Sequence, residues 1–404
     1  MAAEYVVASV TLAFTAAESS LRKVCFVFLL GLAVVETRLL PFLSGPEQLR
    51  GVFAFSCFVK SLHFVSLFFI LRVEIAQLLP QNATPSARFL AALNCVTSTR
   101  GIGTPWEVKP RTQRGRDRDQ PPKSKPKSRT QYIAKTLLTL IWQYVALDLL
   151  NFGAVRYFQR EWPGALSASA EFLGPASSKE QLLARLPLSC LLLVNLRLLF
   201  SMIHRVIAVV VVGLFAGDPE KWPPLFGRVW DLRYCRVRDC WAIYWHSLLR
   251  WPLATISTAL QARYLPATPR KAHQLTHLFL IFTISGILHV LSAIYAGVPD
   301  NIGAIFLFFV GNAAAIVVED VVRPRPPPRA RRDSDETAWS CFLGFLGLLA
   351  WTFVSVPLFA YTALRIPVQT NVVMPVSLVE RVGGRVVAGG VFAGWVAWNT
   401  VIGG

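Results

Sequence analysis

The sequence predicts an all-α integral membrane protein, a bundle of about eight or nine transmembrane helices in one domain covering residues 1–404. The first indication is composition: 54% of the residues are hydrophobic and only 16% are charged, unlike a soluble globular domain. The second is the recurrence of apolar runs close to the length that spans a bilayer. Candidate spans lie at 4–18, 24–42, 51–72, 132–153, 187–215, 275–297, 301–321, 338–364 and 387–404.

The basic residues lie mainly between these apolar runs. The formal net charge is +18, which would suggest nucleic acid as a partner for a soluble protein. Here the charges more naturally set topology, so we expect a lipid bilayer and no nucleic acid. The longest basic segment is 97–131, and its proline-broken part at about 110–130 is predicted to be flexible and cytosolic. Because successive spans cross the membrane in opposite directions, 216–274 and 322–337 are then also cytosolic. If all nine spans cross, the N-terminus is in the lumen and the C-terminus is in the cytosol.

Several common sites are missing from the sequence. The seven cysteines form no CxxC pair, and the acidic residues form no aspartate-rich cluster for Mg²⁺. His273 and His277 are four residues apart in "HQLTH", but no glutamate lies between them as zinc peptidases require. "RGIGTP" at 100–105 leads to no P-loop lysine. We therefore expect no metal site and no tightly bound cofactor.

One histidine lies deep inside an apolar run. His289 is near the middle of "LFLIFTISGILHVLSAIY" at 278–295, and helical spacing puts Ser285 and Ser292 on the same face. An ionisable residue at this depth is costly and is often functional, and desolvation favours the neutral imidazole that can act as a base. The alternative is that the imidazole only bonds a neighbouring helix and holds the bundle together.

A second histidine follows an aromatic and arginine-rich stretch. His246 lies in "RDCWAIYWHSLLRW", and residues 240–262 are predicted to form an interfacial or re-entrant helix with its tryptophans, Trp251 among them, at headgroup level. Ordinary interfacial anchoring is the alternative for this stretch. The arginines and tryptophans that could hold an anionic soluble donor are Arg228, Arg233, Arg236, Arg238, Trp241 and Trp245, although the arginines could equally serve topology or lipid headgroups.

This combination favours acyl transfer from a thioester. The thioester is already activated, so the protein needs to remove the proton of an acceptor hydroxyl, orient the reactants and stabilise the oxyanion. A membrane-embedded histidine can act as the base, and a cytosolic basic segment can hold the phosphates of coenzyme A (CoA).

Three blocks of this sequence resemble the membrane-bound O-acyltransferase superfamily, in particular its fungal wax-synthase-like branch. The blocks are "RGIGTPWEVK" at 100–109, "WPPLFGRVWD" leading to "RDCWAIYWHSLLR" at 222–250, and "SGILH" at 285–289. The resemblance implies a helical bundle around a reaction tunnel, with a wax-synthase-like core at about 216–321. It also implies that His289 is the catalytic histidine and that His246 fills the second site position, where sterol- and diacylglycerol-acylating relatives have an asparagine.

The resemblance further implies transfer of an acetyl group from acetyl-CoA to a lipophilic terpenoid or meroterpenoid alcohol, in the endoplasmic reticulum. His289 would accept the hydroxyl proton, and His246, Ser285 or a backbone amide would stabilise the oxyanion. A wax or sterol ester synthase that uses long-chain acyl-CoA is the alternative within the family. A non-enzymatic transporter is the alternative from another class, and it would need paired broken helices in corresponding halves.

Overall fold

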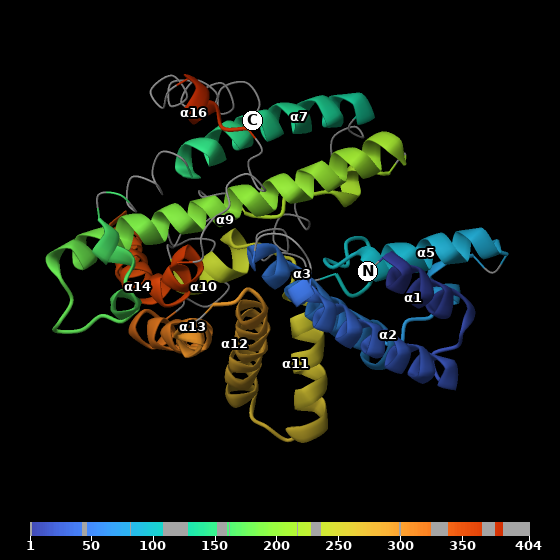
Figure 1. Cartoon of the computed structure of the whole chain (residues 1–404). Helices are drawn as coiled ribbons and strands as arrows, with labels where there is room; N and C mark the ends of the chain where they lie inside the picture. Colours follow the sequence, from blue (N-terminus) through green and yellow to red (C-terminus); the bar gives the residue numbers. More distant parts are fainter. Residues whose placement is uncertain are drawn as a thin grey trace. The chain divides into compact units, whose positions relative to one another are not determined.

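The computed structural model describes residues 2–42, 47–80, 82–107, 128–151, 160, 162–215, 217–227, 236–298, 300–324, 338–365 and 376–382. Every regular element within these ranges is helical, which confirms the all-α prediction. The chain divides into two compact units, one made of 1–108 and 247–323, the other of 109–246 and 324–404. Figure 1 shows the helices in sequence colours.

Seven helical segments in the described ranges are long and apolar enough to cross a membrane. They are Ser20–Phe42, Arg50–Ile70, Arg129–Asn151, Lys179–Leu214, Arg270–Tyr295, Ile302–Val322 and Cys341–Thr362. Each corresponds to a predicted span. The predicted span at 4–18 is the 13-residue helix α1 (Ala2–Phe14), which at 1.5 Å per residue is too short for a hydrocarbon core of about 30 Å. The predicted span at 387–404 lies outside the described residues.

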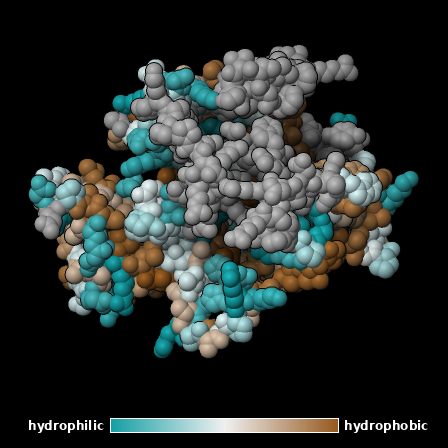
Figure 2. Space-filling model, turned by 180° about the vertical axis from the view of Figure 1, so that it is seen from behind, coloured by the Kyte–Doolittle hydropathy of each residue, from teal (hydrophilic) through white to brown (hydrophobic). Residues whose placement is uncertain are grey.

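Apolar side chains cover the outer faces of these helices. Figure 2 shows areas of hydrophobic residues on the described part of the face in view. On α2 (Ser20–Leu39), Val24 and Val27 are 65% and 67% exposed. Large aliphatic side chains exposed in this number would be unfavourable in water and are suited to lipid.

The first unit is arranged around α12 (Arg270–Tyr295). This helix packs against α13 (Ile302–Val322), α3 (Glu47–Val65) and α11 (Arg250–Tyr264). Helix α1 packs against α2 and α5 (Pro85–Thr97), and the short α4 (Ile75–Leu78) contacts α5. A hydrophobic core that includes Leu12, Phe64 and Phe68 also contains Trp251, which is completely buried.

Residues 240–262 do not form the single interfacial helix that the sequence predicted. A π-helical turn covers Cys240–Tyr244, the regular helix ends there, and α11 begins only at Arg250. Trp251 is 0% exposed and packs 4.8 Å from His63, ring centroid to centroid. Trp251 therefore contacts protein and not lipid headgroups, because its indole is buried in the protein core.

The second unit is arranged around α9 (Lys179–Leu214), a 36-residue helix. Helices α7 (Arg129–Asp148) and α14 (Ala338–Arg365) pack against it, and α16 (Leu378–Val382) packs against α7. Arg185 on α9 is buried and donates to the carbonyl of Phe353, 3.1 Å away. Pro357 lies four residues after Phe353 in α14 and has no N–H, so Arg185 supplies the hydrogen bond that the proline removes.

Candidate active site

His289 is oriented by its own helix. Its Nδ1 lies 2.7 Å from the carbonyl oxygen of Ser285, one turn earlier in α12. A carbonyl can only accept, so Nδ1 carries the proton and the neutral ring presents Nε2 as the basic nitrogen. The side chain is half-buried, whereas Ser285 is buried. The contact between these two predicted site residues therefore uses the backbone of Ser285, which the sequence pattern could not show.

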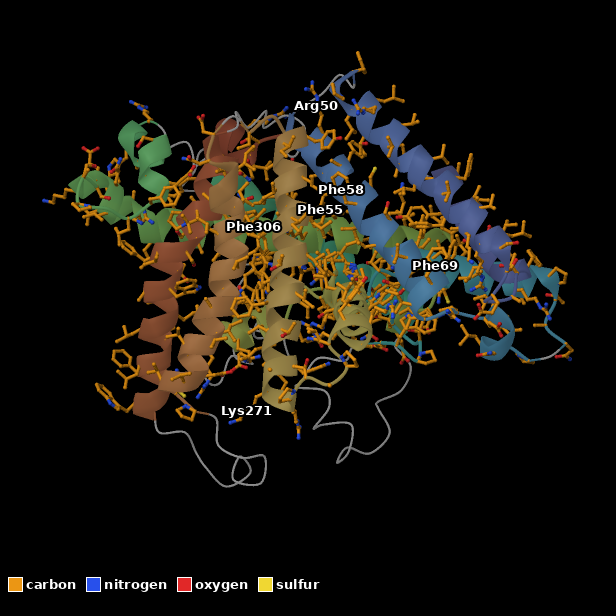
Figure 3. All side chains as sticks on the ribbon, turned by 90° about the horizontal axis from the view of Figure 1, so that it is seen from below. Arg50, Phe55, Phe58, Phe69, Lys271 and Phe306 are labelled. Carbon is orange, nitrogen blue, oxygen red and sulfur yellow. The ribbon has the colours of Figure 1, made fainter. Side chains whose placement is uncertain are left out.

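Aromatic rings on two other helices enclose the His289 imidazole. Phe309 on α13 stacks on it at a centroid distance of 4.3 Å, and Phe55 on α3 lies 4.8 Å away in a tilted arrangement. Figure 3 shows α12 between α3, which carries Phe55 and Phe58, and α13, which carries Phe306. The imidazole is thereby held between apolar walls on a rigid helix.

Two glycines allow the helices to come this close. A Cβ on Gly286 would lie 3.1 Å from the Phe306 ring and 3.2 Å from the Cβ of Phe309. A Cβ on Gly51 of α3 would lie 2.8 Å from the Cβ of Ala296. The hydroxyl of Ser292 donates to the carbonyl of Gly51 over 2.8 Å. Of the predicted polar face, Ser292 therefore links α12 to α3 through its hydroxyl.

His246 belongs to the second unit and lies among aromatic rings. Its centroid is 5.7 Å from Phe200 on α9, 5.9 Å from Phe226 and 5.6 Å from Trp245. The predicted donor residues Trp241 and Trp245 pack edge to face at 6.0 Å, directly before it. Trp241, Trp245 and His246, which the sequence analysis took from one block, thus form one aromatic cluster.

The two halves of the tryptophan-rich block meet in this unit. The N–H of Gly227 donates to the carbonyl of Tyr244 over 3.1 Å. A Cβ on Gly227 would lie 2.2 Å from the Ile243 carbonyl oxygen, so any larger residue would push the two segments apart. On α9, His204 contacts the carbonyl of Pro223 through Nε2 at 3.1 Å. The segment "WPPLFG" is thereby fixed against both α9 and the π-helical turn.

Arg197 on α9 contacts both halves and was missed by the sequence analysis. Its guanidinium lies 4.5 Å from the Tyr244 ring centroid and 4.9 Å from that of Phe226. It also donates to the Gly227 carbonyl over 3.0 Å. An arginine inside the apolar run at 187–215 was the available signal, because such a residue is unfavourable in lipid unless a protein contact compensates it.

The predicted donor arginines are only partly described. Arg228 and Arg233 lie outside the described residues. Arg236 is 4% exposed and Arg238 is half-buried, so neither is an open surface charge. Within the described ranges, no group of three or more His, Cys, Asp or Glu side chains is placed to hold a metal.

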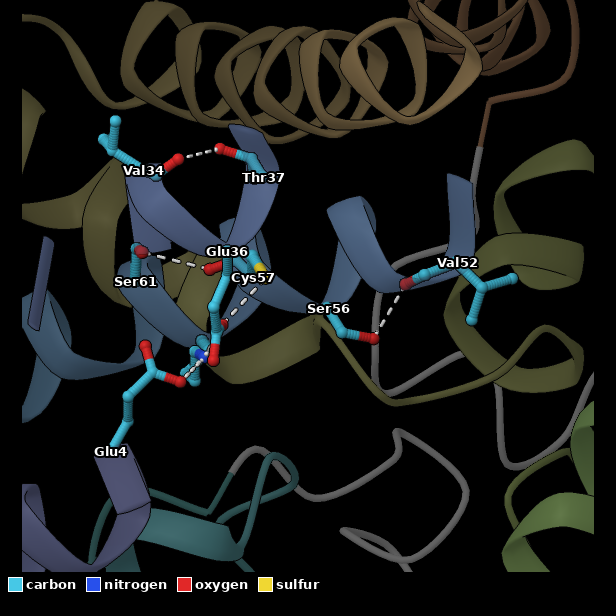
Figure 4. Close-up of polar contacts among 9 residues, drawn as sticks. Glu4, Val34, Glu36, Thr37, Val52, Ser56, Cys57 and Ser61 are labelled. Atoms are coloured by element: carbon cyan, nitrogen blue, oxygen red, sulfur yellow. Dashed lines mark hydrogen bonds and ion pairs between the residues drawn. The ribbon is translucent and has the colours of Figure 1, made fainter. Parts of the chain in front are cut away.

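A buried ion network in the first unit was also missed. Lys60 on α3 pairs with Glu4 on α1 and, at 3.0 Å, with Glu36 on α2, and the Cys57 thiol lies 3.3 Å from Glu36 (Figure 4). Glu36 and Lys60 are charged residues inside predicted apolar spans, and this was the sequence signal for a buried ion pair. Breaking such a buried pair is strongly destabilising, so the network holds α1 against α2 and α3.

These features define a multi-pass helical membrane protein with two histidine-bearing blocks. The model of the "Membrane bound O-acyl transferase family" matches residues 222–311, a range that contains both His246 and His289. The chain is 30% identical to acetyltransferase pyr8 of Aspergillus fumigatus, over 86% of this chain and 82% of that protein. It is 27% identical to acetyltransferase atnC of Arthrinium sp. (79% and 73% covered) and 26% identical to acetyltransferase TRI7 of Fusarium sporotrichioides (71% and 67%).

The chain belongs to the membrane-bound O-acyl transferase family, among its fungal acetyltransferase-like members. It is therefore an acyltransferase and an integral membrane protein, and the transporter alternative is excluded. No solved structure matches the chain significantly.

Proposed function

We propose that this enzyme transfers an acetyl group from acetyl-CoA to a hydroxyl of a lipophilic secondary metabolite, such as a terpenoid or meroterpenoid alcohol. The names of the three relatives support acetyl as the acyl group. The observation that carries the reaction chemistry is the contact between His289 Nδ1 and the Ser285 carbonyl, because it fixes the tautomer in which Nε2 is the base. An acceptor that reaches His289 from the apolar side would suit the surrounding phenylalanines.

The reaction proceeds by proton removal and acyl transfer. His289 Nε2 accepts the hydroxyl proton while the hydroxyl oxygen forms a bond to the acetyl carbonyl carbon. The resulting tetrahedral oxyanion collapses, the carbon–sulfur bond breaks, and CoA leaves as a thiolate that regains the proton from the imidazolium. General base catalysis of this kind typically contributes about 10²- to 10⁴-fold. His246 is our candidate for stabilising the oxyanion, and we propose that the reaction takes place inside the helical bundle in a membrane of the endoplasmic reticulum.

Release of the CoA thiol from acetyl-CoA tests whether His289 is the catalytic base. Microsomes that contain wild type or His289→Ala are supplied with a panel of terpenoid alcohols and one fatty alcohol. We expect acetyl-dependent thiol release with a terpenoid alcohol, and a loss of about 10²- to 10⁴-fold in the variant. His273→Gln is the matched control on α12, since His273 contributes its backbone carbonyl to Gln261. Turnover within a few-fold of wild type in an inserted His289→Ala protein would remove His289 from the mechanism.

The preferred length of the donor's acyl chain distinguishes an acetyltransferase from a wax or sterol ester synthase. The same assay is run with acetyl-, butyryl- and palmitoyl-CoA. A site built for acetyl should lose turnover as the chain lengthens. Preference for palmitoyl-CoA with a fatty alcohol would replace the acetyl assignment by the long-chain alternative.

A further inference from the structure

One phenylalanine of the tryptophan-rich block packs against both His246 and the residue before it. Phe226 is 7% exposed, and its ring lies 5.9 Å from the His246 imidazole, centroid to centroid, at an interplanar angle of 82°. The same ring lies 5.6 Å from that of Trp245, edge to face at 85°. The direction of both side chains after the π-helical turn therefore depends on where the Phe226 ring is held.

Arg197 on α9 contacts this phenylalanine and its neighbours. Its guanidinium lies 4.9 Å from the Phe226 ring centroid and donates to the carbonyl of the next residue, Gly227, over 3.0 Å. It also lies 4.5 Å from the ring centroid of Tyr244, the last residue of the π-helical turn. The N–H of Gly227 donates to the Tyr244 carbonyl over 3.1 Å. The guanidinium and the two segments therefore form one closed set of contacts.

Helix α9 also contacts His246 directly. Phe200 follows Arg197 by three residues, a spacing that puts both side chains on one face of the helix. The Phe200 ring lies 5.7 Å from the His246 imidazole, centroid to centroid, at an interplanar angle of 77°. One face of α9 therefore acts on His246 by two routes, directly through Phe200 and indirectly through Arg197 and Phe226.

A guanidinium group is well suited to hold a ring and a carbonyl at the same time. Its flat face stacks on an aromatic ring while the N–H groups in its plane donate to an oxygen, whereas an ammonium group has no such face. Arg185, earlier on α9, makes the same two kinds of contact with α14. Its guanidinium lies 5.4 Å from the Phe353 ring centroid and donates to the Phe353 carbonyl over 3.1 Å. The two arginines thus share a chemistry and differ in the segment that each one holds.

We propose that Arg197 is a positioning residue for His246, and that it sets the direction of the imidazole through the Phe226 ring and the Tyr244 end of the π-helical turn. Removal of the guanidinium releases the ring and the Gly227 carbonyl, and the imidazole then populates orientations that do not face the oxyanion. This role requires no contact between Arg197 and either substrate. Its effect on turnover rests on the proposed function, in which His246 stabilises the oxyanion, whereas its effect on the orientation of the imidazole does not.

Chemical labelling of individual histidines tests the orientation of His246 without relying on turnover. The full-length protein in phosphatidylcholine nanodiscs is treated with diethyl pyrocarbonate, which carbethoxylates imidazole nitrogens, and peptide mass spectrometry gives the rate at each histidine. We expect Arg197→Gln to raise the rate at His246 by about three- to tenfold, the usual effect of losing one cation–π contact or hydrogen bond. Arg197→Lys should raise it less, because it keeps the charge. Arg185→Gln is the matched control and should leave the rate at His246 unchanged.

A buried histidine shows whether each variant remains folded. His63 is 1% exposed, and its Nε2 lies 3.0 Å from the carbonyl of Cys95, so it should react only when the protein unfolds. If both His63 and His246 react faster in Arg197→Gln, the same two rates are compared in Arg197→Lys. A rate at His246 equal to that of wild type in the folded variant overturns the proposal. An equal rise in Arg185→Gln also overturns it, because any loosening of α9 would then be sufficient.

Turnover connects the orientation of the imidazole to the proposed reaction. Arg197→Gln should lower kcat by about three- to tenfold and leave KM for acetyl-CoA within about twofold of wild type. In a His246→Phe background the same substitution should lower kcat by less than about twofold, because the imidazole that Arg197 positions is already absent. Where His246→Phe itself lowers turnover, equal effects in the two backgrounds overturn the positioning role. If His246→Phe turns over like wild type, the oxyanion role in the proposed function fails, and the labelling rates alone decide whether Arg197 orients the imidazole.

Discussion

The two candidate site histidines are held by different kinds of structure. His289 lies inside a 26-residue helix, and a backbone carbonyl of that helix orients its ring. His246 follows a π-helical turn where the regular helix has ended, and surrounding aromatic side chains enclose it. A side chain on a rigid helix keeps its direction when neighbours change, whereas one on a loop depends on the contacts around it. We infer that the orientation of His289 is insensitive to changes in the neighbouring side chains, whereas the orientation of His246 depends on the side chains around it.

Among the substitutions that test this comparison of His289 with His246, replacement of His246 should reduce turnover the most. If its imidazole donates to the oxyanion, His246→Ala should lower turnover by about 10²- to 10³-fold, the usual cost of one such donor. His246→Asn should recover part of the loss, because an amide can donate a hydrogen bond. Initial rates of thiol release at saturating acetyl-CoA measure both variants.

His246→Phe is the control that separates chemistry from packing. Phenylalanine preserves the aromatic contacts with Phe200 and Phe226 but cannot donate a hydrogen bond. Wild-type turnover in this variant would show that His246 serves only to pack the cluster. Turnover as low as in His246→Ala, from a protein with unchanged thermal unfolding, would support the oxyanion role.

A pair of glycine substitutions should have the next largest effect. The Cβ of Gly227→Ala would approach the backbone carbonyl of Ile243 to 2.2 Å, and a backbone atom cannot rotate away. The Cβ of Gly286→Ala would lie 3.1 Å from the Phe306 ring, which can shift slightly, and 3.2 Å from the Cβ of Phe309, so both contacts are longer than the one at Gly227. We expect Gly227→Ala to destabilise its unit by about 1–3 kcal/mol or more, and Gly286→Ala by less.

Thermal unfolding and turnover of the two alanine variants provide the measurement. Gly227→Ala should lower the melting temperature and also the turnover, because the segments on either side of it lead to the His246 cluster. Gly286→Ala should retain most of its turnover. The reverse order would mean that the α12–α13 contact, and not the block around His246, is the more sensitive part of the enzyme.

The sequence predicted the spans well because a bilayer imposes a single length requirement on every crossing helix. Apolar runs such as 275–297 and 301–321 therefore became α12 and α13 almost within their expected limits. The break at 245–249 was not predicted, since the aromatic pattern of 240–262 is equally compatible with a continuous surface helix. Burial of Trp251 could not be read from the sequence either, because it depends on His63 and Trp106, which are distant in the chain.

The candidate site was predictable to a different degree at each residue. His289 could be identified from its rarity in an apolar run and from the family resemblance. The roles of Arg197 and Lys60 could not, because their partners come from other segments of the chain. Each did interrupt an apolar run, so an intramembrane charge is a signal that deserved the same weight as the histidine.

Ser285→Ala should have the smallest effect, and it tests how His289 is oriented. The contact to His289 Nδ1 uses the carbonyl of Ser285, which alanine retains. We therefore expect a change in turnover of less than about threefold, or roughly 0.6 kcal/mol. Ser292→Ala is the matched variant on the same helix, and it should lose about 0.6 kcal/mol of stability because its hydroxyl bonds to Gly51. A decrease of about 10²-fold or more in Ser285→Ala would instead assign its hydroxyl to the oxyanion, and the base would then share its helix with the second catalytic group.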